Sequence, residues 1–263
     1  MSAATTAAPA TGALPTPKFL GVLRAEIFKM SRQPVNWLMA AGVLAMVALP
    51  WVLLPTTPFI RNELQANPLI AQFVQMGRSL TILRVFGGLF VIVLTARVFG
   101  LDYQQGTIRI ILARGVGRLQ LLGAKLLTVT LAALAILGVG VLADWLYAVV
   151  FTSAAAGNLN SFNALTPTFW LDVRLYVLTI AISMGVTILM ASAATVLGRS
   201  LSFGLAAGLV FFPADNILST ILTLLSQTTN NTFWLNLTGY LLGPTLNTMP
   251  TKWIAPITST VTQ

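Results

Sequence analysis

Long apolar stretches alternate with shorter polar ones along this chain, and five of the apolar stretches are long enough to cross a membrane. A bilayer core about 30 Å thick needs about 20 mostly apolar residues in an α-helix. The five stretches are residues 35–54, 79–99, 119–143, 175–197 and 201–225. The pattern predicts an all-α polytopic membrane protein, a helical bundle whose transmembrane domain covers residues 34–225.

Residues 17–33 precede the first span and carry an amphipathic helical pattern. Apolar residues recur at the spacing of one helical face: Leu20, Leu23, Ile27 and Met30. Lys18, Lys29 and Arg32 fall on roughly the opposite face, which favours a short helix at the membrane surface. An N-terminal extension of the first span is the alternative, but the Gln33-Pro34 step predicts a break between the two helices.

The two ends of the chain differ from the spans. Residues 1–16 are uncharged and rich in Ala, Thr and Pro, which predicts a disordered cytosolic tail. Residues 226–263 hold no stretch long enough to cross a membrane. Their prolines and aromatic residues predict an extracytoplasmic segment of re-entrant or short helices at the outer interface.

Composition agrees with this class and excludes several others. Hydrophobic residues make up 56% of the 263 positions and charged residues 8%, whereas globular domains carry about 25% charged residues. The net charge of +9 is spread around the apolar stretches, not gathered on one dense face, so we expect no nucleic-acid partner. The chain has no Cys and no His, which excludes thiolate and imidazole chemistry, and we expect no bound metal or cofactor.

Basic residues set the predicted orientation, because Lys and Arg are retained on the cytoplasmic side of a membrane. Ten of the fifteen lie before the first span, between the second and third spans, or at Arg199 between the fourth and fifth. Four lie on the opposite side, and Arg84 lies within the second span. We therefore expect a cytoplasmic N-terminus.

The loop between the second and third spans, residues 100–118, is unusually basic and rich in glycine. Gly106 permits a tight turn, and Thr107 can cap a following helix if it occupies the N-cap position. The isoleucines that follow would give a short helix able to dock in a groove of a soluble partner, with arginines binding carboxylates. The alternative is a plain loop whose arginines only anchor the topology.

Residues 101–127, LDYQQGTIRIILARGVGRLQLLGAKLL, resemble the cytosolic loop of permease subunits of type-2 ATP-binding-cassette (ABC) exporters. That family shows an acidic residue, Gly-Thr, an Arg, and a small-residue/Arg turn that opens the next helix. The matching residues here are Asp102, Gly106, Thr107, Arg109, Arg114, Gly115, Arg118 and Lys125. The N-terminal helix and the first four spans match the family in the same order.

The resemblance implies that the first seven of these residues, Asp102 to Arg118, form a coupling site for a separate ABC ATPase subunit. It also implies a second permease subunit, identical or homologous, in the inner membrane of a bacterial cell, with ATP bound only by the ATPase. Two features depart from the family: Asp102 stands where Glu is more frequent, and five spans are evident where the family has six. Either this is a five-span variant or a sixth span is missing from the given residues, and we expect the latter.

Polar residues within the spans are candidates for a translocation path. Arg84 in the second span either lines the path or extends to the outer surface. Pro213 is expected to interrupt the fifth span, where Asp215 and Asn216 either contact substrate or cap the second half-helix. An ion pair between Asp215 and Arg84 is a third alternative.

Two further features concern packing. Asp144, near the outer end of the third span, is expected at the interface. Gly204-x-x-x-Gly208 predicts close helix packing, either within the chain or across a dimer axis.

The combined interpretation is the permease subunit of an ABC exporter, in which this chain has no catalytic residues. The sequence contains no G-x-x-x-x-G-K-[ST] phosphate-binding loop, so ATP hydrolysis would belong to another subunit. The alternative is a non-transporting membrane scaffold or immunity protein. The transported substrate is not readable from the sequence.

Overall fold

The computed structural model describes residues 18–56 and 58–253, so the tail predicted for residues 1–16 lies outside the described part of the chain. Within the described residues every regular element is a helix, which confirms the predicted fold class. The five candidate spans are confirmed as long helices: α2 (Pro34–Thr56), α4 (Pro68–Gln104), α6 (Arg118–Ala156), α7 (Pro167–Gly198) and α8 (Leu201–Thr229).

Two of these helices are much longer than their apolar stretches predict. α4 has 37 residues and α6 has 39, where about 20 residues cross a bilayer core. At 1.5 Å per residue each helix is more than about 50 Å long. Both therefore extend beyond the apolar layer, and their ends carry polar residues that the hydropathy pattern left outside the spans.

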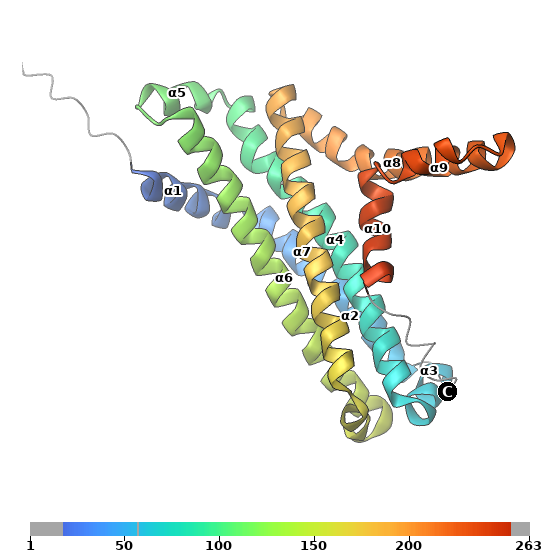
Figure 1. Ribbon diagram of the computed structural model, residues 1–263. Helices are drawn as coiled ribbons and strands as arrows, with labels where there is room; N and C mark the ends of the chain where they lie inside the picture. Colours follow the sequence, from blue (N-terminus) through green and yellow to red (C-terminus); the bar gives the residue numbers. More distant parts are fainter. Residues whose placement is uncertain (1–17, 57, 254–263) are drawn as a thin grey trace, which may run out of the picture.

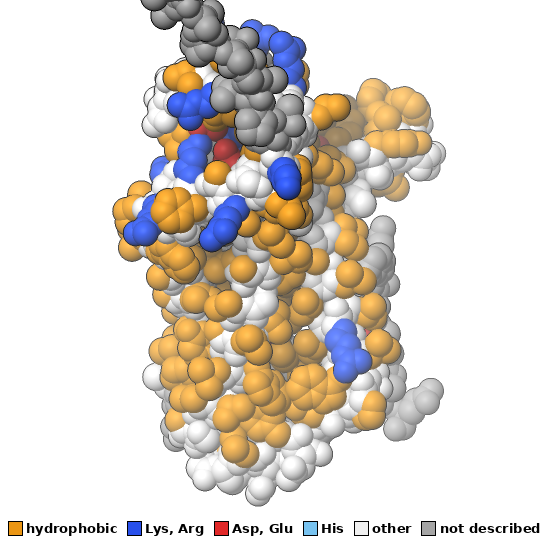
Figure 2. All heavy atoms as spheres, turned by 90° about the vertical axis from the view of Figure 1, so that its left-hand side faces the viewer, with side chains coloured by type: hydrophobic (Ala, Val, Ile, Leu, Met, Phe, Trp, Pro, Cys, Tyr) orange, Lys and Arg blue, Asp and Glu red, His pale blue; other side chains and the backbone are white. Residues whose placement is uncertain are grey.

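The core of the bundle forms around α4, which packs against α2, α6, α7 and α8 (Figure 1). Val47, Leu80, Leu83, Val91 and Ile180 are among its fully buried side chains. Many large apolar side chains remain exposed on the outer faces of the same helices, as Figure 2 shows for one side of the molecule. A helix that is apolar all round is typical of a membrane span, because its outward face meets lipid.

Short helices lie at both ends of the bundle. α1 (Phe19–Ser31) and α5 (Thr107–Ala113) lie at the same end, and α3 (Pro58–Ala66), which the sequence pattern missed, lies at the other (Figure 1). The predicted break between α1 and the first span is present, since α2 begins at Pro34. The Asn36 side-chain amide donates to the Met30 carbonyl across that break, which satisfies a backbone acceptor freed at the end of α1.

The C-terminal helices depart from a simple up-and-down bundle. α8 begins at the end of the bundle that carries α5, and its later part projects sideways together with α9 (Thr232–Thr238) (Figure 1). α10 (Leu242–Trp253) then turns back and packs against α8 and α7. A short 3₁₀ helix, Asn160–Ala164, joins α6 to α7. On which side of a membrane residues 226–263 lie stays a prediction, and residues 254–263 are outside the described part.

One expectation about α8 is wrong, and the structure decides between the two alternatives for its glycines. Pro213 does not interrupt the helix, which continues from Leu201 to Thr229 with the proline inside it, so Asp215 caps no second half-helix. The Gly204 and Gly208 positions pack within the chain: a Cβ at Gly204 would meet Thr195 of α7, and one at Gly208 would meet Ile92 of α4. These two glycines therefore serve close intramolecular packing and do not form an open dimer face.

Candidate coupling site

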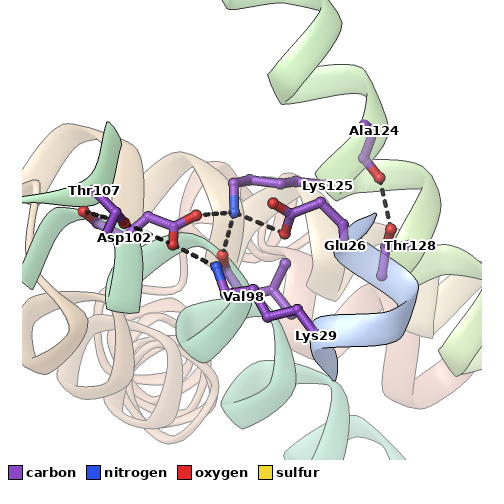
Figure 3. Close-up of polar contacts among 8 residues, drawn as sticks. All are labelled: Glu26, Lys29, Val98, Asp102, Thr107, Ala124, Lys125 and Thr128. Atoms are coloured by element: carbon purple, nitrogen blue, oxygen red, sulfur yellow. Dashed lines mark hydrogen bonds and ion pairs between the residues drawn. The ribbon is translucent and has the colours of Figure 1, made fainter. Parts of the chain in front are cut away.

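A cluster of four charged residues joins three helices at the end of the bundle that carries α5 (Figure 3). Asp102, near the end of α4, is 1% exposed and accepts hydrogen bonds from the ammonium groups of Lys29 on α1 and Lys125 on α6. Lys125 also donates to the Glu26 carboxylate of α1 at 3.0 Å and to the Val98 carbonyl at 2.7 Å. Two carboxylates and two ammonium groups thus balance each other.

The cluster is buried, and this burial determines how it affects the stability of the protein. Glu26, Asp102 and Lys125 are all less than a tenth exposed, whereas the Lys29 side chain is 36% exposed. Pairing charges in a dry site does little for net stability, because desolvation offsets the attraction. Removing one partner, however, leaves an uncompensated buried charge and costs about 3–5 kcal/mol. The cluster therefore fixes the relative positions of α1, α4 and α6.

The turn from α4 into α5 adds a fourth helix to this connection. Gly106 occupies the N-cap position of α5 with φ 67°, a left-handed conformation that glycine adopts at little cost. Thr107 therefore stands inside α5 and not at its N-cap. Its hydroxyl donates instead to the Asp102 carboxylate at 3.0 Å, so one carboxylate contacts α1, α5 and α6 from its place on α4.

The outer surface of α5 faces away from the bundle. None of its residues is buried, and Ile110 is 55% exposed. Ile110 lies on this surface, and Arg109, Arg114 and Gly115 are also exposed, the last two in the turn that follows. Gly115 has φ 82°, so this turn also needs a glycine. Such a short helix, with an apolar residue between two arginines, can dock in a groove lined by carboxylates.

The seven residues predicted as the coupling site fall into two groups. Asp102, Gly106 and Thr107 form the inner connection, with the Asp102 carboxylate buried and turned toward the cluster. The arginines and Gly115 lie outside it: Arg109 and Arg118 line a hollow of about 1000 Å³ beside α5, and Arg114 lies in the exposed turn. The first group of predicted residues thus connects helices inside the protein, and the second group is accessible to a partner.

Sequence reasoning missed the contribution of α1. Glu26 and Lys29 were not among the predicted site residues, yet both pair with the cluster. One signal was available, since Glu26 is the sole acidic residue of α1 and stands next to an apolar position. An acid on the apolar side of an interfacial helix implies a basic partner in the protein, because an unpaired carboxylate is costly to bury.

The three residues predicted for a translocation path meet through α10 and not directly. The Arg84 guanidinium donates to the Leu246 carbonyl at 3.4 Å and to the Asn247 side chain. The Asn247 amide donates to Asn216 at 3.0 Å, and the carboxylate of Asp215 accepts from the backbone N–H of Gly243. Within the described residues no ion pair joins Asp215 to Arg84. A role in transport stays a prediction for all three.

Asp144 has a hydrogen-bond partner inside the bundle, and its depth relative to the membrane interface stays a prediction. It is fully buried in α6 and accepts a hydrogen bond from the Trp51 indole at 2.6 Å. Pro50 weakens the hydrogen bonding of the preceding turn of α2, because it lacks an N–H and its ring crowds a carbonyl. Ser79 donates to the nearby Val47 carbonyl at 3.0 Å and Gln75 to the Pro50 carbonyl at 3.3 Å, so polar groups of α4 bind backbone carbonyls of this part of α2.

The architecture defines a multi-pass helical membrane protein with a connected cluster at one end. A family model described as ABC-2 family transporter protein matches residues 22–214, from α1 into α8, which includes the cluster and α5. The chain therefore belongs to the ABC-2 transporter family and is a membrane permease component of an ABC transporter. Searches of curated proteins and of solved structures found no match.

Proposed function

We propose that this chain is the membrane-spanning subunit of an ABC exporter and that a separate ATPase subunit drives it. Members of the family generally work with an ATPase partner. The observation that carries the proposal is the contact of Asp102 with α1, α5 and α6 at once. A force applied to the small exposed helix α5 would reach three longer elements through this one carboxylate.

The proposed orientation places α1 and α5 in the cytoplasm, where the ATPase would be. Lys and Arg side chains gather at this end of the molecule, whereas the face below them is mostly apolar (Figure 2). Retention of basic residues on the cytoplasmic side supports this orientation. The membrane in this proposal is a bacterial inner membrane, with the N-terminus of the chain on its cytoplasmic side.

In the proposed mechanism, Ile110 and Arg114 contact the ATPase and the inner residues transmit its movement. Ile110 would fill an apolar depression, and Arg114 would bind a carboxylate at its rim. Closure of the ATPase on ATP would move α5, and the Thr107–Asp102 hydrogen bond would transfer that movement to α4. Lys125 and Lys29 would carry α6 and α1 along, because both pair with the same carboxylate.

A second permease subunit, identical or homologous, would complete the transporter, with the path between the two copies. Arg84, Asp215 and Asn216 are the candidates for path-lining residues in such a pair. Each of them contacts α10, so α10 would move together with α4 and α8 during transport.

The test is co-purification with the cognate ATPase subunit, followed by its ATPase rate in reconstituted membranes. Replacing Ile110 and Arg114 together by Ala should abolish stable association while leaving the permease folded, because both side chains are exposed. The matched control is Arg24→Ala on the exposed face of α1, which should associate normally. If wild-type permease neither binds nor stimulates the ATPase, the proposal fails and a non-transporting scaffold becomes the better account.

A further inference from the structure

The hollow beside α5 combines three arginines with an apolar wall. It has a volume of about 1000 Å³ and is bounded by the end of α4, by α5, by the start of α6 and by the end of α7. Arg109, Arg118 and Arg199 line it, each from a different part of the chain. Lys125 and Asp102 also line it, but they pair with each other. The hollow is therefore strongly positive.

None of these arginines has a carboxylate partner among the residues that the structure describes. The ion pairs of the described residues join Lys29 and Lys125 to Glu26 and Asp102, and none includes Arg109, Arg118 or Arg199. Three like charges around one hollow repel each other, and an anion bound among them would relieve this repulsion.

Helix α6 adds a second argument for an anion. Arg118 is its first residue, and its first turn contains no acidic side chain. The N-terminus of a helix carries partial positive charge, so a cation there is unfavourable and an anion is favourable. The chain thus places a basic side chain where the helix alone would favour an acidic one, which indicates that the compensating charge comes from a ligand.

Part of the remaining wall of the hollow is apolar and lies at the ends of the spans. Leu119 is 83% exposed and Leu122 is 37% exposed, and Leu112 and Val196 lie on the same lining. An occupant that satisfies both parts must carry an anionic group and a hydrocarbon portion. A soluble anion would leave these leucines in contact with water, whereas a lipid would cover them.

We propose that this hollow binds the phosphate headgroup of an anionic phospholipid from the leaflet that meets this end of the bundle. The Arg109, Arg118 and Arg199 guanidinium groups bind the phosphate oxygens, for which their fork geometry is suited. The acyl chains lie against Leu119 and Leu122. Basic pockets between membrane helices recognise lipid headgroups in this way.

The experiment measures lipid retention by the purified full-length chain with no ATPase present. Native mass spectrometry counts bound lipid after addition of phosphatidylglycerol or of phosphatidylcholine with the same acyl chains. We expect the first phosphatidylglycerol to bind preferentially to the wild type. Because one basic residue near an anionic headgroup contributes roughly a fivefold factor, Arg118→Gln with Arg199→Gln should weaken that binding by about 20-fold or more. Arg109 stays unchanged, since it also belongs to the α5 surface.

The matched control is Arg24→Gln with Arg32→Gln, which removes the same charge from exposed positions at this end of the chain, outside the hollow. The control should bind phosphatidylglycerol as the wild type does. Equal weakening in both double variants would overturn the proposal, because the basic surface as a whole would then attract lipid. So would displacement of the lipid by equimolar inorganic phosphate, which would identify a soluble anion as the ligand.

A third outcome concerns the ATPase. If the Arg118/Arg199 variant retains phosphatidylglycerol normally but no longer binds the ATPase, the hollow receives protein carboxylates and the lipid proposal is wrong. Loss of lipid preference in this variant supports it whether or not ATPase binding also changes, because Arg118 is also among the predicted coupling residues. Lipid retention is measured with no ATPase present, so failure of this proposal leaves the coupling mechanism unaffected.

Discussion

The hydroxyl of Thr107 donates to the carboxylate of Asp102 at 3.0 Å, across a turn of only five residues. This hydrogen bond joins the exposed seven-residue helix α5 to the buried charge cluster of α1, α4 and α6. Its acceptor is charged, and hydrogen bonds to charged groups contribute about 1.5–3 kcal/mol. The same carboxylate binds two lysines, so the hydroxyl completes a connection that would otherwise exclude α5.

Thr107→Val should separate assembly from coupling. Valine has the same shape but no hydroxyl, so α5 stays in place while its hydrogen bond to Asp102 is lost. We expect normal binding of the ATPase subunit and a several-fold lower permease-stimulated ATPase rate in proteoliposomes. Thr107→Ser, which keeps the hydroxyl, is the control and should retain most of the stimulation. A fully active valine variant would show that the hydrogen bond transmits nothing.

Asp102→Asn should destabilise the protein by about 3–5 kcal/mol, because the buried Lys125 then keeps only Glu26 as counter-charge and the partly exposed Lys29 loses the carboxylate it pairs with. Thermal unfolding in detergent measures this as a lower Tm. Asp102→Glu keeps the charge and should fall between the variant and the wild type. An unchanged Tm for Asp102→Asn would mean that the cluster does not hold α1 and α6 in place.

Gly106→Ala tests the turn between α4 and α5. A Cβ there meets no neighbouring atom within 4 Å, so any cost comes from the left-handed backbone at φ 67°. That conformation costs a non-glycine residue about 1–2 kcal/mol. Gly21→Ala, in the helical part of α1 and also free of neighbours, should instead stabilise by about 0.5–1 kcal/mol. Opposite shifts in Tm would separate the conformational requirement from general helix propensity.

Trp51→Phe should lower the free energy of unfolding by about 1–3 kcal/mol. The indole N–H is the hydrogen-bond donor to the fully buried Asp144 carboxylate, and phenylalanine leaves that oxygen without it. Adding Asp144→Leu to the same protein removes the unsatisfied group and should recover part of the loss. A double-mutant cycle based on denaturation midpoints measures the coupling, and strict additivity would argue against it.

Asp215→Ala should loosen α10 from α8. The Asp215 carboxylate accepts from the Gly243 N–H, and a side chain at Gly243 would crowd both Asp215 and Asn216. Hydrogen exchange at the start of α10 should accelerate, while exchange in α4 and α6 stays unchanged. Asp215→Asn retains an acceptor oxygen and is the control. If substrate export also falls in a well-folded Asp215→Ala protein, the path-lining prediction gains support.

The sequence predicted the spans and the break before Pro34 because both depend on local composition. The lengths of α4 and α6 were underestimated, because both helices continue beyond the apolar stretch and include polar residues at their ends. Pro213 was expected to break α8, but the helix accommodates it. Whether a proline breaks a helix depends on tertiary partners for the freed backbone groups, which hydropathy does not show.

The candidate site was predicted only in part, for a related reason. The residues from Asp102 to Arg118 are contiguous in sequence, so a motif could reveal them. The partners Glu26 and Lys29 lie 99 and 73 positions away from Lys125 and Asp102, respectively. No local pattern specifies such a contact. The burial of Asp144 was likewise not predicted, since it depends on Trp51 of a distant helix.

The separation of these partners has a consequence for biosynthesis. α1 leaves the ribosome before the spans, but the residues that hold it, Asp102 and Lys125, are translated 73 and 99 residues after their partners Lys29 and Glu26. Lys29 gains its counter-charge with the second span, which carries Asp102, whereas Glu26 gains its own only with the third span, which carries Lys125. The full set of ion pairs of α1 therefore closes only after three spans have reached their places, so the final position of α1 depends on completion of this part of membrane insertion.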